Sequence, residues 1–204
     1  TLSASDFYER EDTCQSKPVR LLYTGRMDRS KGLMDILAAL HGLIAAGEDL
    51  VWDLVGMPVK GDPVLDELFA RANEYGLGER IKFHGYKPLG PELFDFYKRS
   101  DIYILASQSS FEGFPRTIWE AMAHGLPVVA TSVGSIPDYI SDCAALVKPR
   151  SPDDLNKSIS KIISDQELRR KNIKRGMFIS KQNTLEARSK ELISSIRNYL
   201  NTKN

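Results

Sequence analysis

The sequence predicts an α/β protein, a doubly wound parallel sheet with helices on both faces and a helical C-terminal tail. Three observations lead to this prediction. Short runs rich in aliphatic and β-branched residues alternate with segments of helical period, the runs are apolar almost throughout, and only helical patterns follow Pro152. Nearly continuous apolar strands joined by helices are typical of parallel sheets that are buried on both faces.

The strands come first in the prediction because their apolar runs are the clearest feature. They are expected at Val19–Tyr23, Leu50–Val55, Ile81–His84, Ile102–Ala106, Val128–Thr131 and Ala144–Val147.

The helices fill the intervals between the strands and the C-terminal part. In the first helix, apolar residues recur at helical spacing from Leu33 to Ile44, and Ser30 is placed as its N-cap. The other helices are expected at Pro63–Tyr75, Gly90–Arg99, Arg116–His124, Pro137–Ser141, Pro152–Ser164, Gln166–Ser180 and Leu185–Leu200.

Composition limits the class of protein. With 204 residues, 42% of them hydrophobic, the chain is long enough to bury a substantial core, and a net charge of +1 gives no general reason to expect nucleic acid. Cys14 and Cys143 lie far apart without paired spacing, which favours free thiols and a cytoplasmic location. No apolar run approaches the roughly 18 residues of a spanning helix.

The domain organisation is expected to have three parts. Because the chain opens without a methionine and residues 6–17 are polar, we interpret residues 1–17 as a connector from a missing N-terminal domain. Residues 18–181 form the α/β domain, and residues 182–204 form a C-terminal helix that can pack on the missing domain.

The carboxyl ends of the strands are where such sheets bind ligands. After the first strand come Arg26 and Lys31, and Lys31 falls in the first turn of the predicted helix, where the helix dipole disfavours a cation. An anionic ligand held between the two cations would remove this conflict. Two solvated surface cations are the alternative interpretation.

The stretch "FEGFPRTIWEAMAHG" carries two carboxylates beside a helix start. Glu120 lies within an apolar helical run, and a buried carboxylate is costly unless a donor pairs with it, either in the protein or on a ligand. Glu112 is expected to face the same cleft. The alternative is structural, with Glu112 capping a backbone turn and Glu120 forming a core salt bridge with Arg26 or Arg116.

Two glycine-containing turns are expected to bring backbone amides to the cleft. Gly113 lets the backbone approach a ligand closely, so that amides of residues 114–117 point into the cleft. Gly134 and Ser135, ahead of Pro137, form a compact nest of amides or simply a turn.

These ordered motifs resemble one family, the retaining glycosyltransferases of the GT-B type, family four (glycosyl transferases group 1). Their C-terminal, donor-binding domain carries two glutamates separated by seven residues. Glu112 and Glu120 match that spacing within "EGFPRTIWEAMAHGLPVVAT", and "GRMDRSKG" supplies Arg26 and Lys31. The resemblance covers residues 19–181 and implies the Rossmann-like half of a GT-B fold. The chain departs from the family where Ser135, Asp138 and Ala106 replace a glycine, a glutamate and a proline.

The resemblance also implies roles for these residues. Arg26 and Lys31 would neutralise the diphosphate of a UDP-, GDP- or ADP-sugar, Glu112 would bind hydroxyls of the sugar, and Glu120 would bind the ribose. Arg26, Lys31 and Glu112 are the predicted catalytic residues. The further donor contacts are Gly113, Phe114, Pro115, Arg116, Thr117, Gly85, Tyr86, Lys87, Gly56, Gly134 and Ser135.

The same resemblance implies a mechanism. The donor phosphate would help to take the acceptor's proton, and the sugar would be transferred with retention and without a protein nucleophile. No metal or other cofactor is expected, because the sequence has no Asp-any-Asp triplet and His41, His84 and His124 are dispersed. We expect the chain alone to bind donor weakly and to transfer nothing, because catalysis needs two domains to close.

Other functions stay open. A nucleotide-sugar-binding module without transfer activity fits the same motifs, and paired carboxylates also occur in hydrolases. A dinucleotide-dependent enzyme is disfavoured, because "TGRMDRSKG" is not a Gly-x-Gly-x-x-Gly turn.

The tail contains a basic stretch that allows two interpretations. It can rest on anionic lipid at the inner membrane surface, as a peripheral contact, or form a solvated helical face. Its basic residues are Arg169, Arg170, Lys171, Lys174, Arg175 and Lys181.

Overall fold

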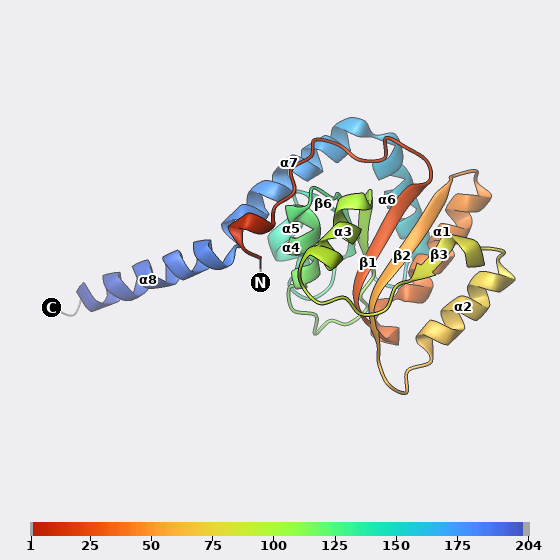
Figure 1. The fold of residues 1–204 in the computed structure, drawn as a ribbon, viewed down its shortest axis with the longest axis horizontal. Helices are drawn as coiled ribbons and strands as arrows, with labels where there is room; N and C mark the ends of the chain where they lie inside the picture. The colour runs from red at the N-terminus through yellow and green to blue at the C-terminus, as the bar shows by residue number, and fades with distance from the viewer. Residues whose placement is uncertain (1, 202–204) are drawn as a thin grey trace.

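A six-stranded sheet forms the centre of the computed structural model, which describes residues 2–201 (Figure 1). All neighbouring strands pair in parallel, in the order β3-β2-β1-β4-β5-β6, so the predicted doubly wound sheet is confirmed. The chain reverses its direction of winding between β1 and β4, and this is where such sheets open a crevice at their carboxyl ends. The strands are β1 Val19–Met27, β2 Leu50–Pro58, β3 Ile81–Phe83, β4 Ile102–Leu105, β5 Val128–Thr131 and β6 Ala144–Val147.

Strands β1 and β2 run further than predicted. Their pairing continues to Met27 and Pro58, past the point where Gly25 lies opposite Gly56. A Cβ on Gly56 would lie 1.8 Å from the carbonyl oxygen of Gly25, so only glycine allows this approach. The extension brings Arg26 to the end of the sheet.

The predicted helices are confirmed within a few residues at each end. They are α1 Leu33–Ala45, α2 Val64–Glu74, α3 Pro91–Arg99, α4 Arg116–Ala123, α5 Ile136–Ile140, α6 Pro152–Ser164, α7 Gln166–Gln182 and α8 Leu185–Asn201, with 3-10 turns η1 Ala4–Asp6, η2 Arg29–Lys31 and η3 Gly78–Arg80.

The predicted N-cap of the first helix is wrong. Ser30 lies inside η2, and its backbone N–H donates to the side chain of Asp28, the N-cap of that turn, at 2.9 Å. Helix α1 begins only after Gly32, whose φ of +66° is left-handed and favours glycine. Lys31 therefore ends a short turn and does not lie in the first turn of α1.

The helices cover both faces of the sheet. Helix α1 packs against α2 and α6, and α4 packs against α7, on opposite sides of the strands (Figure 1). The side chains of Leu21, Trp52, Tyr103 and Val129 are fully buried between these layers. The core therefore holds the strands rigidly, and their carboxyl ends open at one edge.

The N-terminal segment lies against the α/β domain and runs alongside α7 (Figure 1). Arg10 donates hydrogen bonds to the backbone carbonyls of Tyr97, Ser100 and His124 at 2.9–3.0 Å. Asp12 forms an ion pair with Arg169 at 2.9 Å. These contacts tie the segment to α3, α4 and α7, and its assignment as a connector from another domain stays a prediction.

Helix α8 projects away from the rest of the structure (Figure 1). Leu192, Ile193 and Ile196 are 49–62% exposed on it. Its packing on a preceding domain stays a prediction. Within residues 2–201 no helix has both the length and the apolar character needed to cross a membrane. Cys14 and Cys143 are free thiols, as predicted.

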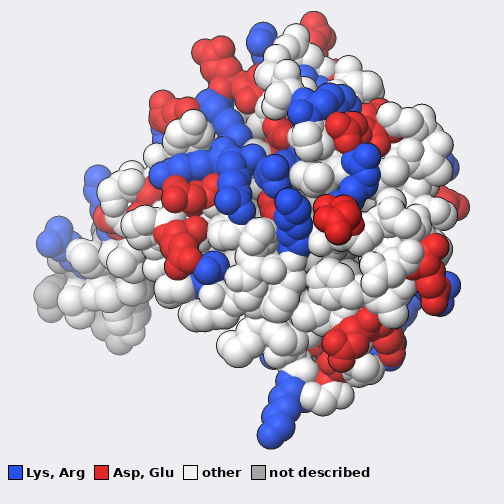
Figure 2. All heavy atoms as spheres, turned by 45° about the vertical axis from the view of Figure 1, so that its right-hand side comes forward, with Lys and Arg blue, Asp and Glu red and all other residues white. Residues whose placement is uncertain are grey.

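The basic stretch on α7 is largely neutralised by acidic partners. Arg169 is buried against Asp12, Arg175 pairs with Asp142, and Lys181 pairs with Glu9. On the face drawn in Figure 2, Lys and Arg gather in a band across the upper half with Asp and Glu along both sides. The acidic partners of Arg169, Arg175 and Lys181 favour the solvated-face interpretation of α7 over a lipid-binding surface.

Candidate functional site

Two adjoining hollows form a cleft at the carboxyl ends of β1, β2 and β4, with volumes of about 330 and 200 Å³. Both hollows are lined by Arg26, Arg116, Thr117 and Glu120. The larger adds the predicted residues Gly56, Tyr86 and Lys87, and the smaller adds Lys31, Glu112 and Pro115.

Arg26 is an exposed cation at the rim of the cleft. Its side chain is 71% exposed, and its guanidinium lies 3.2 Å from the carboxylate of Asp28. The Tyr23 hydroxyl donates to the Arg26 carbonyl, which fixes the backbone and leaves the side chain free to turn. Arg26 can therefore contact an anion in the cleft.

Lys31 and Glu112 form an ion pair across the point where the winding reverses. Lys31 Nζ lies 2.6 Å from Glu112 Oε2, and the two side chains are only 15% and 14% exposed. The Ser107 hydroxyl donates to the same oxygen. The surface-cation interpretation is wrong for Lys31, and the turn-capping interpretation is wrong for the Glu112 side chain.

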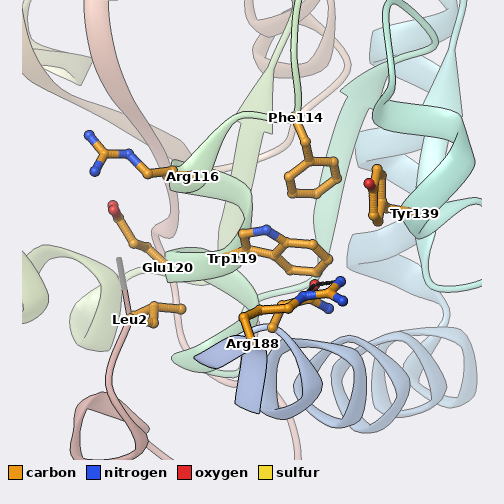
Figure 3. A pocket seen from close by; sticks show the side chains of 8 residues that line it. Leu2, Phe114, Arg116, Trp119, Glu120, Tyr139 and Arg188 are labelled. Atoms are coloured by element: carbon orange, nitrogen blue, oxygen red, sulfur yellow. Dashed lines mark hydrogen bonds between the residues drawn. The ribbon is translucent and has the colours of Figure 1, made fainter. Parts of the chain in front are cut away.

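Glu120 is buried on α4, as predicted, with 7% of its surface exposed. The Tyr97 hydroxyl donates to Glu120 Oε2 at 2.8 Å. In the described part of the chain neither Arg26 nor Arg116 forms an ion pair with Glu120, so the core salt bridge is wrong. The carboxylate points toward the Arg116 side and away from the Trp119 ring (Figure 3).

The surroundings of Glu120 change its acidity. Burial raises the pKa of Glu120 above 4.5, and the Tyr97 hydrogen bond and the charge of Arg116 partly oppose this effect. A carboxyl with a raised pKa in the folded state stabilises the fold below the unfolded pKa, and this stabilisation is lost as pH rises through the folded value. Ionised Glu120 therefore destabilises the ligand-free protein at neutral pH.

Replacing Glu120 by glutamine should consequently stabilise the ligand-free chain at pH 7. We expect the thermal midpoint to rise, because the amide carries no charge that folding must bury. At pH 3 the gain should vanish, because a glutamate side chain is then protonated in both the folded and the unfolded state. Thermal unfolding followed by circular dichroism at the two pH values tests this, with exposed Glu11→Gln as the matched control. A variant that is less stable than wild type at pH 7 would contradict it.

Phe114 faces away from the cleft. Its ring stacks on Trp119 at 4.2 Å between centroids and meets Tyr139 at 5.0 Å. These rings border a third hollow of about 520 Å³, which shares Arg116 and Glu120 with the cleft (Figure 3). Pro115 is the N-cap of α4 and supplies no side-chain hydrogen bond to the first helical turn. Of residues 114 and 115, only Pro115 lines the cleft, so Phe114 can serve the cleft only through its backbone.

The predicted glycine turns differ in what they do. The Ser135 N–H donates to the Glu112 carbonyl at 3.3 Å. The predicted nest at Gly134 and Ser135 therefore supports the Glu112 loop, and the Ser135 amide is used within the protein rather than offered to a ligand. The Gly85 carbonyl likewise accepts the Gly56 N–H at 2.9 Å. At Gly113, by contrast, an added Cβ would meet no atom within 4 Å, so this backbone is open.

Sequence reasoning missed the hydroxyl groups beneath the cleft. Thr24 directly follows the predicted strand Val19–Tyr23 and Ser107 follows β4, so the rule that located Arg26 could have found them. Tyr97 lies in the last turn of α3, and Tyr103 lies inside β4. Neither position carries a spacing or composition that distinguishes it from an ordinary core residue.

The three histidines have structural partners. His84 Nε2 lies 2.6 Å from Asp53 Oδ1, and His124 Nδ1 lies 2.7 Å from the Glu120 carbonyl oxygen. His41 stacks on Tyr75. Across residues 2–201, no group of three or more His, Cys, Asp and Glu side chains could hold a metal ion. The expectation that no metal is needed stays a prediction.

Comparison with known proteins identifies relatives over most of the chain. The family model described as glycosyl transferases group 1 matches residues 5–177. O-antigen chain mannosyltransferase B of Escherichia coli is 28% identical over 178 residues, which are 86% of this chain and 45% of that protein. D-inositol 3-phosphate glycosyltransferase 1 of Catenulispora acidiphila is 34% identical over 57% of this chain and 28% of its own. The chain thus spans less than half the length of these relatives.

Solved structures share the fold. The C-terminal domain of a glycosyl transferase group 1 family protein, LpcC of Francisella tularensis, is 25% identical and matches 91% of this chain and all of that domain, with a TM-score of 0.77. Anabaena Alr3699/HepE, solved in complex with UDP-glucose, is 22% identical over 89% of this chain and 49% of its own, with a TM-score of 0.78.

Proposed function

Because the chain belongs to the glycosyl transferases group 1 family, we propose that it is the donor-binding part of a retaining glycosyltransferase that uses a nucleotide-diphosphate sugar. One observation carries this proposal. A single cleft gathers two cations, Arg26 and Lys31, with two carboxylates, Glu112 and Glu120. This set matches the charges and hydroxyls of such a donor, and the structural relative solved with UDP-glucose supports the same choice.

The cations would act on the diphosphate. Negative charge grows on the leaving diphosphate as the glycosidic bond breaks, and fixed positive charges stabilise that change. Lys31 would lie nearest the sugar end, because it is held against Glu112. Arg26 would reach in from the rim. Since these two side chains supply the positive charge, we propose that donor binding needs no divalent metal.

The carboxylates would bind hydroxyl groups. Glu112 would accept from hydroxyls of the donor sugar and Glu120 from the ribose diol. The nucleobase would lie toward Gly56, Met57 and Tyr86, where backbone and apolar side chains form the wall. Such a wall discriminates little between nucleobases, so UDP-, GDP- and ADP-sugars are all candidate donors.

Transfer would proceed with retention of configuration. We propose no protein nucleophile or base, and the donor phosphate would accept the acceptor's proton. The acceptor would bind to a further domain of a longer, cytoplasmic protein, and the chain by itself would bind donor weakly and transfer nothing. A non-catalytic binding module is the alternative.

Contact with the inner membrane surface stays a prediction that now depends on Lys171 and Lys174, whose ammonium groups have no ion pair among residues 2–201.

Calorimetric titration with UDP, GDP, ADP and their sugar conjugates, with and without a chelator, tests this proposal. We expect one nucleotide class to bind, without a metal, and Arg26→Ala to weaken binding about tenfold, the effect of losing one hydrogen bond to a charged group. Arg71→Ala is the matched control, because Arg71 is also exposed and paired with a carboxylate, Glu74, but lies on α2. Equal losses in the two variants, or no binding by wild type, would contradict the assignment.

A further inference from the structure

A chain of buried hydroxyl groups lies beneath the cleft. Tyr97 OH lies 2.6 Å from Thr24 Oγ1 and 2.8 Å from Glu120 Oε2. Tyr97 is fully buried and Thr24 is 4% exposed. A phenol has one hydrogen, and an ionised carboxylate can only accept. Tyr97 therefore donates to Glu120 and accepts from Thr24. The hydrogen bonds thus all point the same way, from Thr24 on β1 through Tyr97 on α3 to Glu120 on α4.

The Tyr97 ring is fixed on several sides. It stacks on the His124 ring at 5.3 Å between centroids, with an interplanar angle of 23°. His124 is held in turn by its contact with the Glu120 carbonyl oxygen. Arg10 donates to the Tyr97 carbonyl at 3.0 Å. The phenol hydroxyl thus stays at the position from which it reaches Glu120.

The carboxylate depends on this one donor. Within residues 2–201 no other side chain donates a hydrogen bond to Glu120, whose helical neighbours Ile118, Ala121 and Met122 are buried and apolar. A glutamate side chain has several rotatable bonds, so an unheld carboxylate would sample many orientations. With Oε2 occupied by Tyr97, the carboxylate presents a fixed acceptor to the cleft that Glu120 lines.

We propose that Tyr97 is a positioning residue that makes the cleft select a ribose over a sugar lacking the 2′ and 3′ hydroxyls. It would do so by holding Glu120 as a preformed acceptor for the diol, with Thr24 orienting the phenol. This inference rests on the proposed function, because it assumes that Glu120 meets a ribonucleotide. Preorganised acceptors bind more tightly because the ligand need not order them.

Tyr97→Phe tests the inference directly. The dissociation constant is measured for whichever of UDP, GDP and ADP binds most tightly, and for its 2′,3′-dideoxy counterpart. We expect wild type to prefer the ribonucleotide and the variant to bind it about tenfold less tightly, because the ligand must then order a free glutamate side chain. Binding of the dideoxy nucleotide should change little. The ratio of the two dissociation constants, dideoxy nucleotide to ribonucleotide, should therefore fall. A merely structural role for Tyr97 would weaken the binding of both nucleotides alike and leave this ratio unchanged.

Tyr103→Phe is the matched control. It also removes a buried phenol hydroxyl from this cluster, but Tyr103 donates to Thr117 Oγ1 at 2.7 Å, meets Thr24 only at 3.3–3.4 Å, and does not bond to Glu120. The ratio should therefore persist in Tyr103→Phe. In a Glu120→Gln background, Tyr97→Phe should have no further effect on the ratio.

Thermal unfolding confirms that each variant is folded. If Tyr97→Phe does not fold, Thr24→Val, which keeps the volume and removes the donor to the phenol, should lower the ratio instead. An unchanged ratio in the folded variant overturns the inference and leaves the proposed function standing. Failure of wild type to bind any of the three nucleotides overturns the proposed function and the inference with it.

Discussion

Replacing Lys31 by alanine should lower the free energy of unfolding by about 3 kcal/mol, the low end of the cost of breaking a buried ion pair, because both side chains keep a small exposed fraction. Among residues 2–201, Glu112 would keep only the Ser107 hydroxyl as a donor, in surroundings where its side chain is 14% exposed. Binding of a nucleotide diphosphate should become undetectable by calorimetry, because the better buried of the two cations in the cleft is lost. Urea unfolding measures the first effect and titration the second.

A double variant separates the two effects. Lys31→Met together with Glu112→Gln removes both charges and keeps similar volumes, so its stability should return to within about 1 kcal/mol of wild type. Its nucleotide binding should stay lost. A single variant as stable as wild type would show that water already screens the pair. Binding restored in the double variant would show that Lys31 does not meet the diphosphate.

The Lys31–Glu112 pair illustrates what sequence reasoning could reach. Both residues were predicted at the cleft, because each follows a strand at its carboxyl end. Each was assigned to a ligand, and their contact with one another across 81 positions was not predicted. The strand order decides which loops meet where the direction of winding reverses. The alternation of helices and strands in the sequence predicts that such a reversal exists, but it does not predict the strand order.

The accuracy of the element boundaries has a similar origin. Strands β5 and β6 and helix α6 match the prediction residue for residue, because prolines and polar residues bound them in the sequence. The ends of β1 and β2 depend on the approach of Gly25 to Gly56, which is a contact between strands. The start of α1 depends on a side-chain bond from Asp28 that competes with Ser30 for the role of cap. Local patterns cannot rank such competing contacts.

Gly134→Ala should be the second severe change. Gly134 has a φ of +54°, which costs a residue with a side chain about 1–2 kcal/mol. Its Cβ would also lie 1.7 Å from the Glu112 carbonyl oxygen, so the Glu112 loop must move. We expect a loss of about 3 kcal/mol in the free energy of unfolding, in the range of backbone and overpacking effects together. Displacing Glu112 would also separate it from Lys31 and abolish nucleotide-sugar binding.

Two other glycines divide this effect into its parts. Gly61 has a φ of +84° and no atom within 4 Å of an added Cβ, so Gly61→Ala measures the backbone strain alone. Gly113 has the same open surroundings without a left-handed φ, so Gly113→Ala should leave stability within about 0.5 kcal/mol of wild type. Any loss of donor binding in Gly113→Ala then reports a ligand lying close to this backbone. If Gly134→Ala costs no more than Gly61→Ala, the contact with Glu112 relaxes freely, and the Gly134–Ser135 turn does not hold the Glu112 loop in place.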